Sequence, residues 1–349
     1  MRALTVVPLQ AGSLAVTEVP DPVPGPDELL VEGIALGVCG TDREIAAGAY
    51  GWAPPGADRL VLGHESLGRV RTAPPASGFA PGDLVVGIVR RPDPEPCPAC
   101  ARGEFDMCRN GRYTERGIKQ IHGYGSELWT VDSGYVVKLD PTLESVGMLL
   151  EPTTVVAKAW DHIERIGNRA WFGPQRVLVT GAGPIGQLAA LLGVQRGLEV
   201  HVLDRVESGL KPRLVEQLGA HYHTGSISGV TRQAMPDIII EATGVAALVL
   251  EAMECNAAAG IVCLTGVSSG GRQLGIDAGQ VNRQIVLEND VVFGSVNANH
   301  HHYQLAADAL AKADRGWLEQ LVTKRIPLER AAEAFQPGGD DIKVVLDLG

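Results

Sequence analysis

The sequence lacks a long apolar run, an excess of basic residues and the features of a secretion signal. Its most apolar helical candidate, residues 184–194, is too short to cross a membrane, because a spanning helix needs about 20 residues. The 30 Lys and Arg residues are outnumbered by 41 Asp and Glu residues, and the net charge of −11 opposes binding to a phosphate backbone. We therefore expect neither a membrane nor a nucleic acid as a partner, and small molecules are favoured instead.

Residues 1–12 contain no apolar run ahead of a small-residue cleavage site, so they are typical of a first strand and not of a signal peptide. We expect a cytoplasmic protein. Cysteine is scarce and unevenly placed. The six cysteines occupy positions 39, 97, 100, 108, 255 and 263. Such spacing suits metal ligation better than a disulfide framework, and the last two, in an apolar helix and an apolar strand, are expected in the core.

The chain of 349 residues is longer than single hydrophobic cores usually grow, which predicts two domains. Up to about residue 150, short β-like runs are broken by Gly and Pro, a pattern typical of an irregular all-β domain. Beyond Glu151 a helical stretch is followed by strands that alternate with helices, which predicts an α/β fold with a parallel sheet. The tail from about residue 297 predicts two amphipathic helices, at 303–324 and 328–336, and a closing strand at 343–349.

A glycine-rich turn follows the apolar run RVLVT and opens a helical stretch. The turn contains Gly181, Gly183, Pro184, Ile185 and Gly186. The first glycine permits a tight turn, the second lets the backbone approach a pyrophosphate, and the third allows close packing of helix on strand. The helix N-terminus attracts the anion. A turn that binds nothing is the alternative, but strand, glycines and helix stand in the order that a dinucleotide site requires.

Asp204 ends the next apolar run, 18 residues beyond Gly186. An acid at this point can accept hydrogen bonds from the adenosine ribose hydroxyls, and it repels a 2′-phosphate. We therefore expect NAD in preference to NADP, although Arg205 leaves NADP possible; otherwise Asp204 merely caps the next helix. Further cofactor contacts are expected where the later apolar runs end, at Thr243, Gly266 and Val267.

The single cysteine of LGVCGTDRE can be combined with the histidine and acid of VLGHESLG. Cys39, His64 and Glu65 are the thiolate, imidazole and carboxylate typical of an open, catalytic zinc site. Glu151, at the expected junction of the domains, is a further candidate ligand. Taken singly, each residue has a structural explanation: a buried thiol, a core histidine or an acid at a helix start.

A second candidate metal site is the C-x2-C-x7-C run of Cys97, Cys100 and Cys108. Three thiolates are one ligand short of a closed structural zinc site, so an oxygen ligand is needed. The candidates for this ligand are Asp93 or Glu95, ahead of Glu104 or Asp106. The run can also lack a metal, and a thioredoxin-like redox pair is disfavoured because no helix opens at the first cysteine.

Together, the motifs Cys-Gly-Thr-Asp, Gly-His-Glu-x-x-Gly, the three-cysteine run and Gly-Ala-Gly-Pro-Ile-Gly resemble the zinc-dependent medium-chain dehydrogenase/reductases over the whole chain. The stretches LLEPTTVVAKAWDHI, YTERGI and GSVNANHHHY are most similar to microbial glucose 1-dehydrogenases. The resemblance implies a GroES-like catalytic domain, residues 1–155 and 297–349, and a Rossmann domain, residues 156–296. It also implies a homodimer or homotetramer.

The resemblance implies roles for particular residues as well. Catalytic zinc is expected on Cys39, His64 and Glu65 or water, with Glu151 as a ligand or substrate contact. Thr41 takes the hydroxyl position of the proton relay, and Glu44 stands where many relatives carry a histidine. The remaining implied residues are sugar contacts at Glu115 and Asn297 and cofactor contacts at Ser295 and Asn297.

The expected reaction is oxidation of an aldose to a lactone. Two departures bear on it: an acid that some relatives use on the sugar is replaced by Val155, and the first cysteine of the usual four-cysteine lobe is missing. Another polyol, cyclitol, amino sugar or secondary alcohol is therefore an alternative substrate. From other classes, a catalytically silent NAD-binding sensor or scaffold and a zinc-independent enone reductase are alternatives. The histidines at 122 and 300–302 are interpreted as structural or solvent-facing residues.

Overall fold

The computed structural model describes residues 1–268, 273–336 and 338–349. Their contacts divide the chain into two compact units. The first unit joins Met1–Glu151 to Ala298–Gly349, and the second is the continuous segment Pro152–Asn297. From the sequence, the corresponding boundaries were expected after residue 155 and before residue 297. Within the described ranges, every helix is too short or too polar to cross a membrane.

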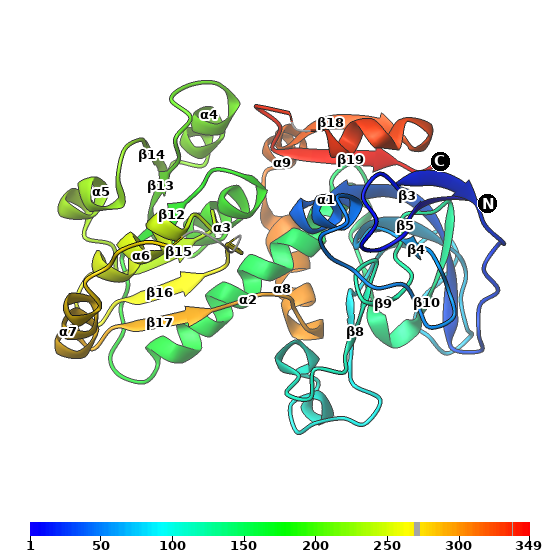
Figure 1. The fold of residues 1–349 in the computed structure, drawn as a ribbon, viewed down its shortest axis with the longest axis horizontal. Coiled ribbons are helices and arrows are strands. Elements are labelled where there is room, and N and C mark those ends of the chain that lie inside the picture. The colour runs from blue at the N-terminus through cyan, green and yellow to red at the C-terminus, as the bar shows by residue number, and fades with distance from the viewer. Residues whose placement is uncertain (269–272, 337) are drawn as a thin grey trace. The chain divides into compact units, whose positions relative to one another are not determined.

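The first unit is built mainly from strands, with few helices (Figure 1). The strands are β1 (Arg2–Val6), β2 (Ala15–Glu18), β3 (Glu28–Val38), β4 (Leu60–Val61), β5 (Glu65–Thr72), β6 (Leu84–Gly87), β7 (Arg90–Arg91), β8 (Thr114–Arg116), β9 (Gln120–Ile121), β10 (Leu128–Asp132), β11 (Val136–Lys138), β18 (Val322–Pro327) and β19 (Lys343–Asp347). The α-helices are α1 (Gly40–Ala46), α8 (His300–Lys312) and α9 (Arg315–Leu321). The 3₁₀ turns are η1 (Cys100–Arg102), η2 (Phe105–Met107), η3 (Ser133–Tyr135), η4 (Pro141–Leu143), η5 (Gly147–Leu149) and η6 (Leu328–Phe335).

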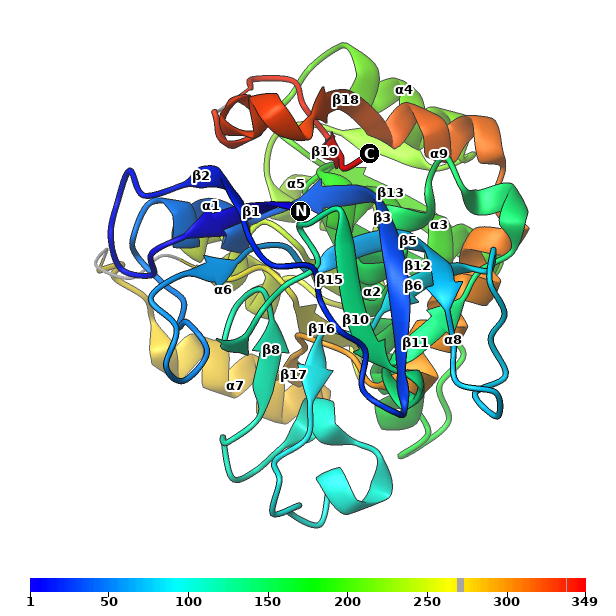
Figure 2. The same ribbon diagram turned by 90° about the vertical axis from the view of Figure 1, so that its right-hand side faces the viewer.

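These strands form one large sheet and two small ones. The large sheet has seven strands in the order β11-β6-β5-β3-β19-β18, with β10 paired to β3 (Figure 2). The small sheets are β2-β1-β4 and β7-β8-β9. Because β19 lies between β3 and β18, the end of the chain is part of the same sheet as its beginning. The irregular β domain predicted for the first 150 residues is confirmed.

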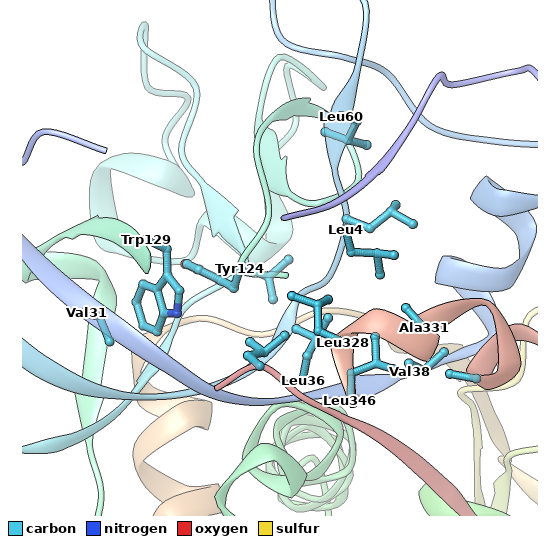
Figure 3. Close-up of a cluster of buried hydrophobic side chains, with 14 of the residues drawn as sticks. Leu4, Val31, Leu36, Val38, Leu60, Tyr124, Trp129, Leu328, Ala331 and Leu346 are labelled. Carbon is cyan, nitrogen blue, oxygen red and sulfur yellow. The ribbon is translucent and has the colours of Figure 1, made fainter. Parts of the chain in front are cut away.

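The core of the first unit lies against this sheet (Figure 3). Leu36 of β3, Leu346 of β19 and Leu328 of η6 lie close together and are at most 1% exposed. The rings of Tyr124 and Trp129 pack with their centroids 4.7 Å apart. Each such side chain contributes about 1.5–3 kcal/mol on burial, so this cluster fixes the strands that carry the candidate site.

The tail differs from the expected pair of helices. The first predicted helix, 303–324, is divided into α8 and α9, because the Asp314 side chain accepts a hydrogen bond from the Trp317 backbone N–H and starts a new helix. Its last residues belong to strand β18. The second predicted helix is the 3₁₀ segment η6, in which Arg330 departs from helical dihedral angles.

The second unit contains a six-stranded sheet whose neighbouring strands are all parallel. Its order is β14-β13-β12-β15-β16-β17, from strands β12 (Arg176–Thr180), β13 (Glu199–Leu203), β14 (His221–His223), β15 (Ile238–Glu241), β16 (Ile261–Leu264) and β17 (Val291–Gly294). The helices are α2 (Leu150–Gly167), which begins in the first unit, α3 (Pro184–Gln195), α4 (Leu210–Gln217), α5 (Ile227–Ala234), α6 (Ala246–Glu254) and α7 (Ala278–Glu288). The predicted α/β fold class is confirmed.

Three histidines lie together at the β14 edge of this sheet. His201 Nδ1 lies 2.9 Å from His223 Nε2, and the ring of His201 stacks on that of His221 with centroids 5.0 Å apart. Glu199 Oε1 faces His201 Nε2 at 3.3 Å. Burial, and then the neighbouring imidazoles, lower the pKa of both His201 and His223 below the usual 6.5. The folded unit therefore favours the neutral form of both rings.

Because these pKa values are lowered on folding, protonation favours the unfolded chain. The stabilisation is present above pH 6.5 and is lost as the pH falls below that value. We expect thermal unfolding of the second unit to shift to lower temperature between pH about 7.5 and about 5.5. His223→Gln should reduce this shift, whereas His300→Gln, at an exposed histidine, should leave it unchanged. An equal shift in both variants would contradict the assignment.

A buried ion pair joins the end of the chain to strand β5. Lys343 Nζ donates to both carboxylate oxygens of Glu65, at 2.7 and 2.6 Å, and each side chain is only 2% exposed. Burying two charges is costly, so neither can lose its partner without a large penalty. The lysine was not singled out from the sequence, because its partner lies 278 residues away.

Lys343→Met should destabilise the metal-free protein by about 3–5 kcal/mol, because it leaves the Glu65 carboxylate buried without its partner. Urea unfolding of chelator-treated protein measures this effect. Arg330→Met is the matched control, since it removes an exposed pair with Glu333 and should cost at most about 1 kcal/mol. Similar losses of unfolding free energy in the two variants would show that the buried ion pair stabilises the protein no more than an exposed one.

Candidate functional site

The first candidate site is built around the start of helix α1. Cys39 is the residue that caps this helix, and its Sγ lies 3.1 Å from Nε2 of His64. His64 lies in the short connection between β4 and β5 and is 5% exposed. Thr41 and Glu44 lie within α1 itself, Thr41 half-buried and Glu44 exposed. The fold thus brings together the thiol and the imidazole that the sequence placed 25 residues apart.

Asp42 holds both members of this pair, although the sequence analysis gave it no role. Its Oδ2 accepts a hydrogen bond from the backbone N–H of Cys39 at 3.0 Å, and its Oδ1 lies 3.3 Å from His64 Nδ1. A carboxylate behind one ring nitrogen leaves the other nitrogen to face a metal, which is the usual outer support of a histidine ligand. The spacing of Cys39 and Asp42, within one helical turn, was the available signal.

Glu65 opens strand β5 directly after His64. It is paired with Gly37 of β3, where an added Cβ would lie 2.0 Å from Glu65 Oε2. The glycine therefore makes room for this carboxylate, which also binds Lys343 as described above. One candidate ligand atom from each of Cys39, His64 and Glu65 lies within 4.8 Å of the others. This arrangement groups the three residues that the sequence proposed for catalytic zinc.

Glu151 is the last residue of the first unit, in the first turn of α2. Burial, together with the charge of Glu65, raises the pKa of its carboxyl to about 7 against the opposing effect of His64. Burial likewise raises the pKa of the Cys39 thiol, although His64 opposes it. Burial lowers the pKa of His64, but Cys39 and Asp42 outweigh it and the net pKa lies well above 6.5.

Two causes act together in these shifts: burial, which is the larger for Cys39 and Glu151, and the acidic groups gathered around His64. The surroundings of His64 include the thiol of Cys39 and the carboxyls of Asp42, Glu65 and Glu151. Such a place favours a cation, and the sulfur, nitrogen and oxygen donors are those that Zn²⁺ prefers. The residues present therefore fit a zinc ion.

The three-cysteine run also forms a compact group. One ligand atom from each of Cys97, Cys100 and Cys108 lies within 4.8 Å of the others, and Cys97 Sγ is 3.6 Å from Cys100 Sγ. The backbone N–H of Arg109 donates to Cys97 and is the main reason that its pKa is lowered to about 6. Burial raises the pKa of Cys100 to about 11.

The fourth ligand expected for this run is not part of that group. Asp93 accepts hydrogen bonds from the backbone N–H of Glu95 at 2.9 Å and from Arg112 Nε at 3.2 Å. Among the other candidates, Asp106 accepts a hydrogen bond from Asn299 Nδ2 at 2.8 Å. Asp93 as a zinc ligand stays a prediction, and it requires that this carboxylate exchange its present partners.

Glu115, expected to contact a sugar, lies in β8 and is 6% exposed. Nε and Nη2 of Arg90 donate to its Oε1 at 3.1 and 2.9 Å, and Nη1 of Arg90 donates to the carbonyl of Asp106 at 2.9 Å. Arg90 also lies 3.7 Å from the ring centre of Tyr113. This arginine, missed in the sequence, holds Glu115 in place and joins it to the segment that carries the cysteines.

The glycine-rich turn connects β12 to α3, as expected. Gly181 has a φ of +90°, and a Cβ on Gly186 would lie 1.7 Å from the carbonyl oxygen of Gly181. Both positions therefore require glycine. Pro184 and Ile185 are the first two residues of α3, and Gly183 caps it. The turn is followed at once by the N-terminus of a twelve-residue helix, and the backbones of Gly181 and Gly186 lie in close contact there.

Asp204 follows β13 and is tied to this turn. Its Oδ2 accepts a hydrogen bond from the backbone N–H of Ala182 at 2.6 Å, and its Oδ1 accepts one from Val206 at 3.1 Å. The carboxylate thus shapes the protein's own loop. Arg205, beside it, is exposed.

The other expected cofactor residues follow neighbouring strands of the same sheet. Thr243 donates from its backbone N–H to the buried carboxylate of Glu241 at 2.8 Å. A Cβ on Gly266 would lie 2.1 Å from the backbone nitrogen of Gly244, so these two loops are in close contact. Val267 is 81% exposed. Ser295 and Asn297 follow β17, and Ser295 donates from its backbone to Leu264 at 2.9 Å.

Comparison with known proteins agrees with both halves of the chain. Residues 25–141 match the alcohol dehydrogenase GroES-like domain, and residues 144–348 match the glucose dehydrogenase C-terminus. The glucose 1-dehydrogenase of Methanocella arvoryzae is 38% identical, with all of both chains covered. That of Thermoproteus tenax is 39% identical, covering 100% of this chain and 99% of the relative.

A solved structure is similar over the whole chain as well. It is glucose dehydrogenase from Haloferax mediterranei in complex with NADP, Zn and gluconolactone, with a TM-score of 0.92, 32% identity and coverage of 100% of this chain and 99% of that one. The expected resemblance, the α/β architecture and the oxidoreductase class are thereby confirmed, whereas the choice between NAD and NADP is not decided. The chain belongs to the glucose dehydrogenase family of the zinc-dependent medium-chain dehydrogenase/reductases.

Proposed function

We propose that this protein is a glucose 1-dehydrogenase that oxidises the C1 hydroxyl of the sugar to a lactone and reduces NAD. The observation that carries this proposal is the pair of half-buried Cys39 and buried His64, 3.1 Å apart and supported by Asp42 and Glu65, in a chain with a complete dinucleotide turn. The similar Haloferax mediterranei enzyme, in complex with gluconolactone, supports the sugar and the product.

In this proposal Cys39, His64 and Glu65 hold the catalytic zinc, with Glu151 as a further ligand or a contact to the sugar. When bound, zinc supplies a Lewis acid next to the hydroxyl that loses its proton. Asp42 keeps Nε2 of His64 directed toward the ion, and Lys343 keeps Glu65 in place. The fit rests on the donor types and on the excess of acidic groups.

Thr41 relays the proton released from the sugar, because a threonine hydroxyl both accepts and donates hydrogen bonds: it takes up that proton as it gives its own away toward solvent. Glu44, exposed on the same helix, is the acceptor nearer to solvent. Glu115, held by Arg90, and Asn297 accept hydrogen bonds from the other sugar hydroxyls. These contacts orient the C1 carbon for transfer of its hydride.

The turn at residues 181–186 binds the pyrophosphate of the dinucleotide, and Asp204 accepts hydrogen bonds from the adenosine ribose. When bound, the nicotinamide supplies the acceptor for the hydride. The three-cysteine run, with Asp93, holds a structural zinc ion. We further propose the homodimer or homotetramer expected from the sequence.

We expect glucose to reduce NAD at a higher kcat/KM than cyclitols, amino sugars or simple secondary alcohols, with lactone as the product. Cys39→Ala should lower turnover by about 10³-fold or more, because several kcal/mol of charge stabilisation are lost with the ion. It should also lower the zinc content while leaving NADH binding intact. Cys255→Ala, which changes a cysteine of the second unit, is the control.

Each rival function gives a different outcome in that experiment. Preference for a cyclitol or another polyol would leave the proposed zinc-dependent oxidation in place but show that glucose is not the substrate. Nucleotide binding without turnover of any alcohol would indicate a sensor, and zinc-free Cys39→Ala protein with full activity would refute the proposed mechanism.

Cofactor preference is tested separately at Asp204. Asp204→Ser should narrow the ratio of NAD to NADP catalytic efficiencies by about tenfold or more, because a charged hydrogen-bond acceptor to the ribose is lost. Asp204→Asn should narrow the ratio as well, because it keeps an oxygen for the Ala182 N–H and removes only the charge; it therefore separates the effect of the charge from that of the loop contact. An unchanged ratio in both variants would make Asp204 a purely structural residue of the loop.

A further inference from the structure

Lys158 is a buried lysine on helix α2 in the second unit. The residue is only 2% exposed, and its Nζ donates a hydrogen bond to the carbonyl oxygen of Val296 at 3.1 Å. A buried ammonium group is costly and is retained only where its hydrogen bonds are satisfied. The lysine therefore ties α2 firmly to the backbone that follows strand β17.

The same ammonium group lies near strand β16. Burial raises the pKa of Cys263, in the middle of that strand, to about 12, and the positive charge of Lys158 acts against this rise. Lys158 is thus placed among three parts of the second unit: its own helix, β16 and the segment at residues 295–297. The stretch LLEPTTVVAKAWDHI contains Lys158, but the sequence gave this lysine no role and did not show this placement.

The segment at 295–297 has a conformation that needs support. Asn297 adopts a φ of +63°, in the left-handed region that few non-glycine residues take, although asparagine takes it more readily than most. The side chain of Val296 is 58% exposed, so packing of that side chain does not hold the segment. Contacts to its backbone help to hold it, among them those from Lys158 to the Val296 carbonyl and from the Ser295 N–H to Leu264.

Ser295 points to a ligand at this segment. The residue is 6% exposed, and its Oγ has no protein hydrogen-bond partner among the residues that the structure describes. It stands directly after the last strand of the parallel sheet, at the carboxyl edge where such sheets bind their ligands. A buried hydroxyl that makes no hydrogen bond to the protein can pair with the amide group of a ligand, because an amide both accepts and donates hydrogen bonds.

We propose that Lys158 is a positioning residue that fixes the 295–297 segment in the conformation that receives the nicotinamide carboxamide. The inference rests on the proposed function only in taking the ligand to be a nicotinamide dinucleotide. Lys158 acts through the Val296 carbonyl and contacts neither sugar nor cofactor. Its removal lets the segment leave the strained conformation and withdraws the Ser295 hydroxyl from the carboxamide.

The test compares two nucleotides that differ at the nicotinamide end. ADP-ribose carries the adenosine and pyrophosphate of NADH but lacks nicotinamide. Lys158→Met in the full chain should weaken NADH binding by about tenfold, because a charged hydrogen bond that orders the segment is lost. The affinity for ADP-ribose should stay within about twofold, and calorimetric titration measures both dissociation constants.

Trp160→Phe is the matched control on the same helix. It removes another buried hydrogen bond of α2, from Trp160 Nε1 to the Ala189 carbonyl at 3.3 Å, and should leave the ratio of the two affinities unchanged. If Lys158→Met does not fold, Lys158→Gln replaces it in the test, because the shorter glutamine side chain does not reach the carbonyl oxygen of Val296. Hydrogen exchange of the amides at 295–297 should rise in either lysine variant.

Equal weakening of NADH and ADP-ribose would show that Lys158 only stabilises the unit, and unchanged affinity for both would show that the segment needs no such support. Either result would overturn the inference while leaving the proposed dehydrogenase intact. Failure of the unaltered chain to bind either nucleotide would overturn the proposed function, and this inference with it.

Discussion

Buried charge is the constraint on which the candidate metal site depends. Four acidic groups surround His64, and the protein can keep them there only by supplying positive charge or a cation. Lys343 meets part of this need through both oxygens of Glu65. His64 meets another part, because the neighbouring Cys39 and Asp42 raise its pKa well above 6.5. The pairing of β19 with β3 brings the lysine to that place.

The second unit relies on a different constraint, which is close approach of backbone to backbone. Gly186 lies against Gly181, and Gly266 lies against Gly244, at distances that no side chain would allow. Asp204 then fixes the first of these turns through the Ala182 N–H. Because Asp204 shapes this turn, a substitution there that removes its side-chain oxygen also changes the loop.

The residues whose chemistry is restrictive could be predicted from the sequence. Cys39 and His64 were identified because few side chains bind zinc, and the glycines of the turn because few residues allow such a backbone. The supporting residues could not be predicted. Lys343, Arg90 and Lys158 have no special motif, and each matters through a partner brought near by strand pairing or helix packing. The division of the tail helix at Asp314 was missed because a capping side chain overrides an apolar period.

The discontinuous first unit has a consequence for the order of events during synthesis. The segment Pro152–Asn297 is continuous and can fold as soon as it leaves the ribosome, since domains generally fold as units. The first unit cannot be completed at that stage, because β19 and Lys343 come later in the chain. Glu65 therefore waits without its partner until Lys343 has been made. A chain that stops before residue 343 keeps all the candidate metal ligands of the first site but lacks the buried counter-charge that holds one of them.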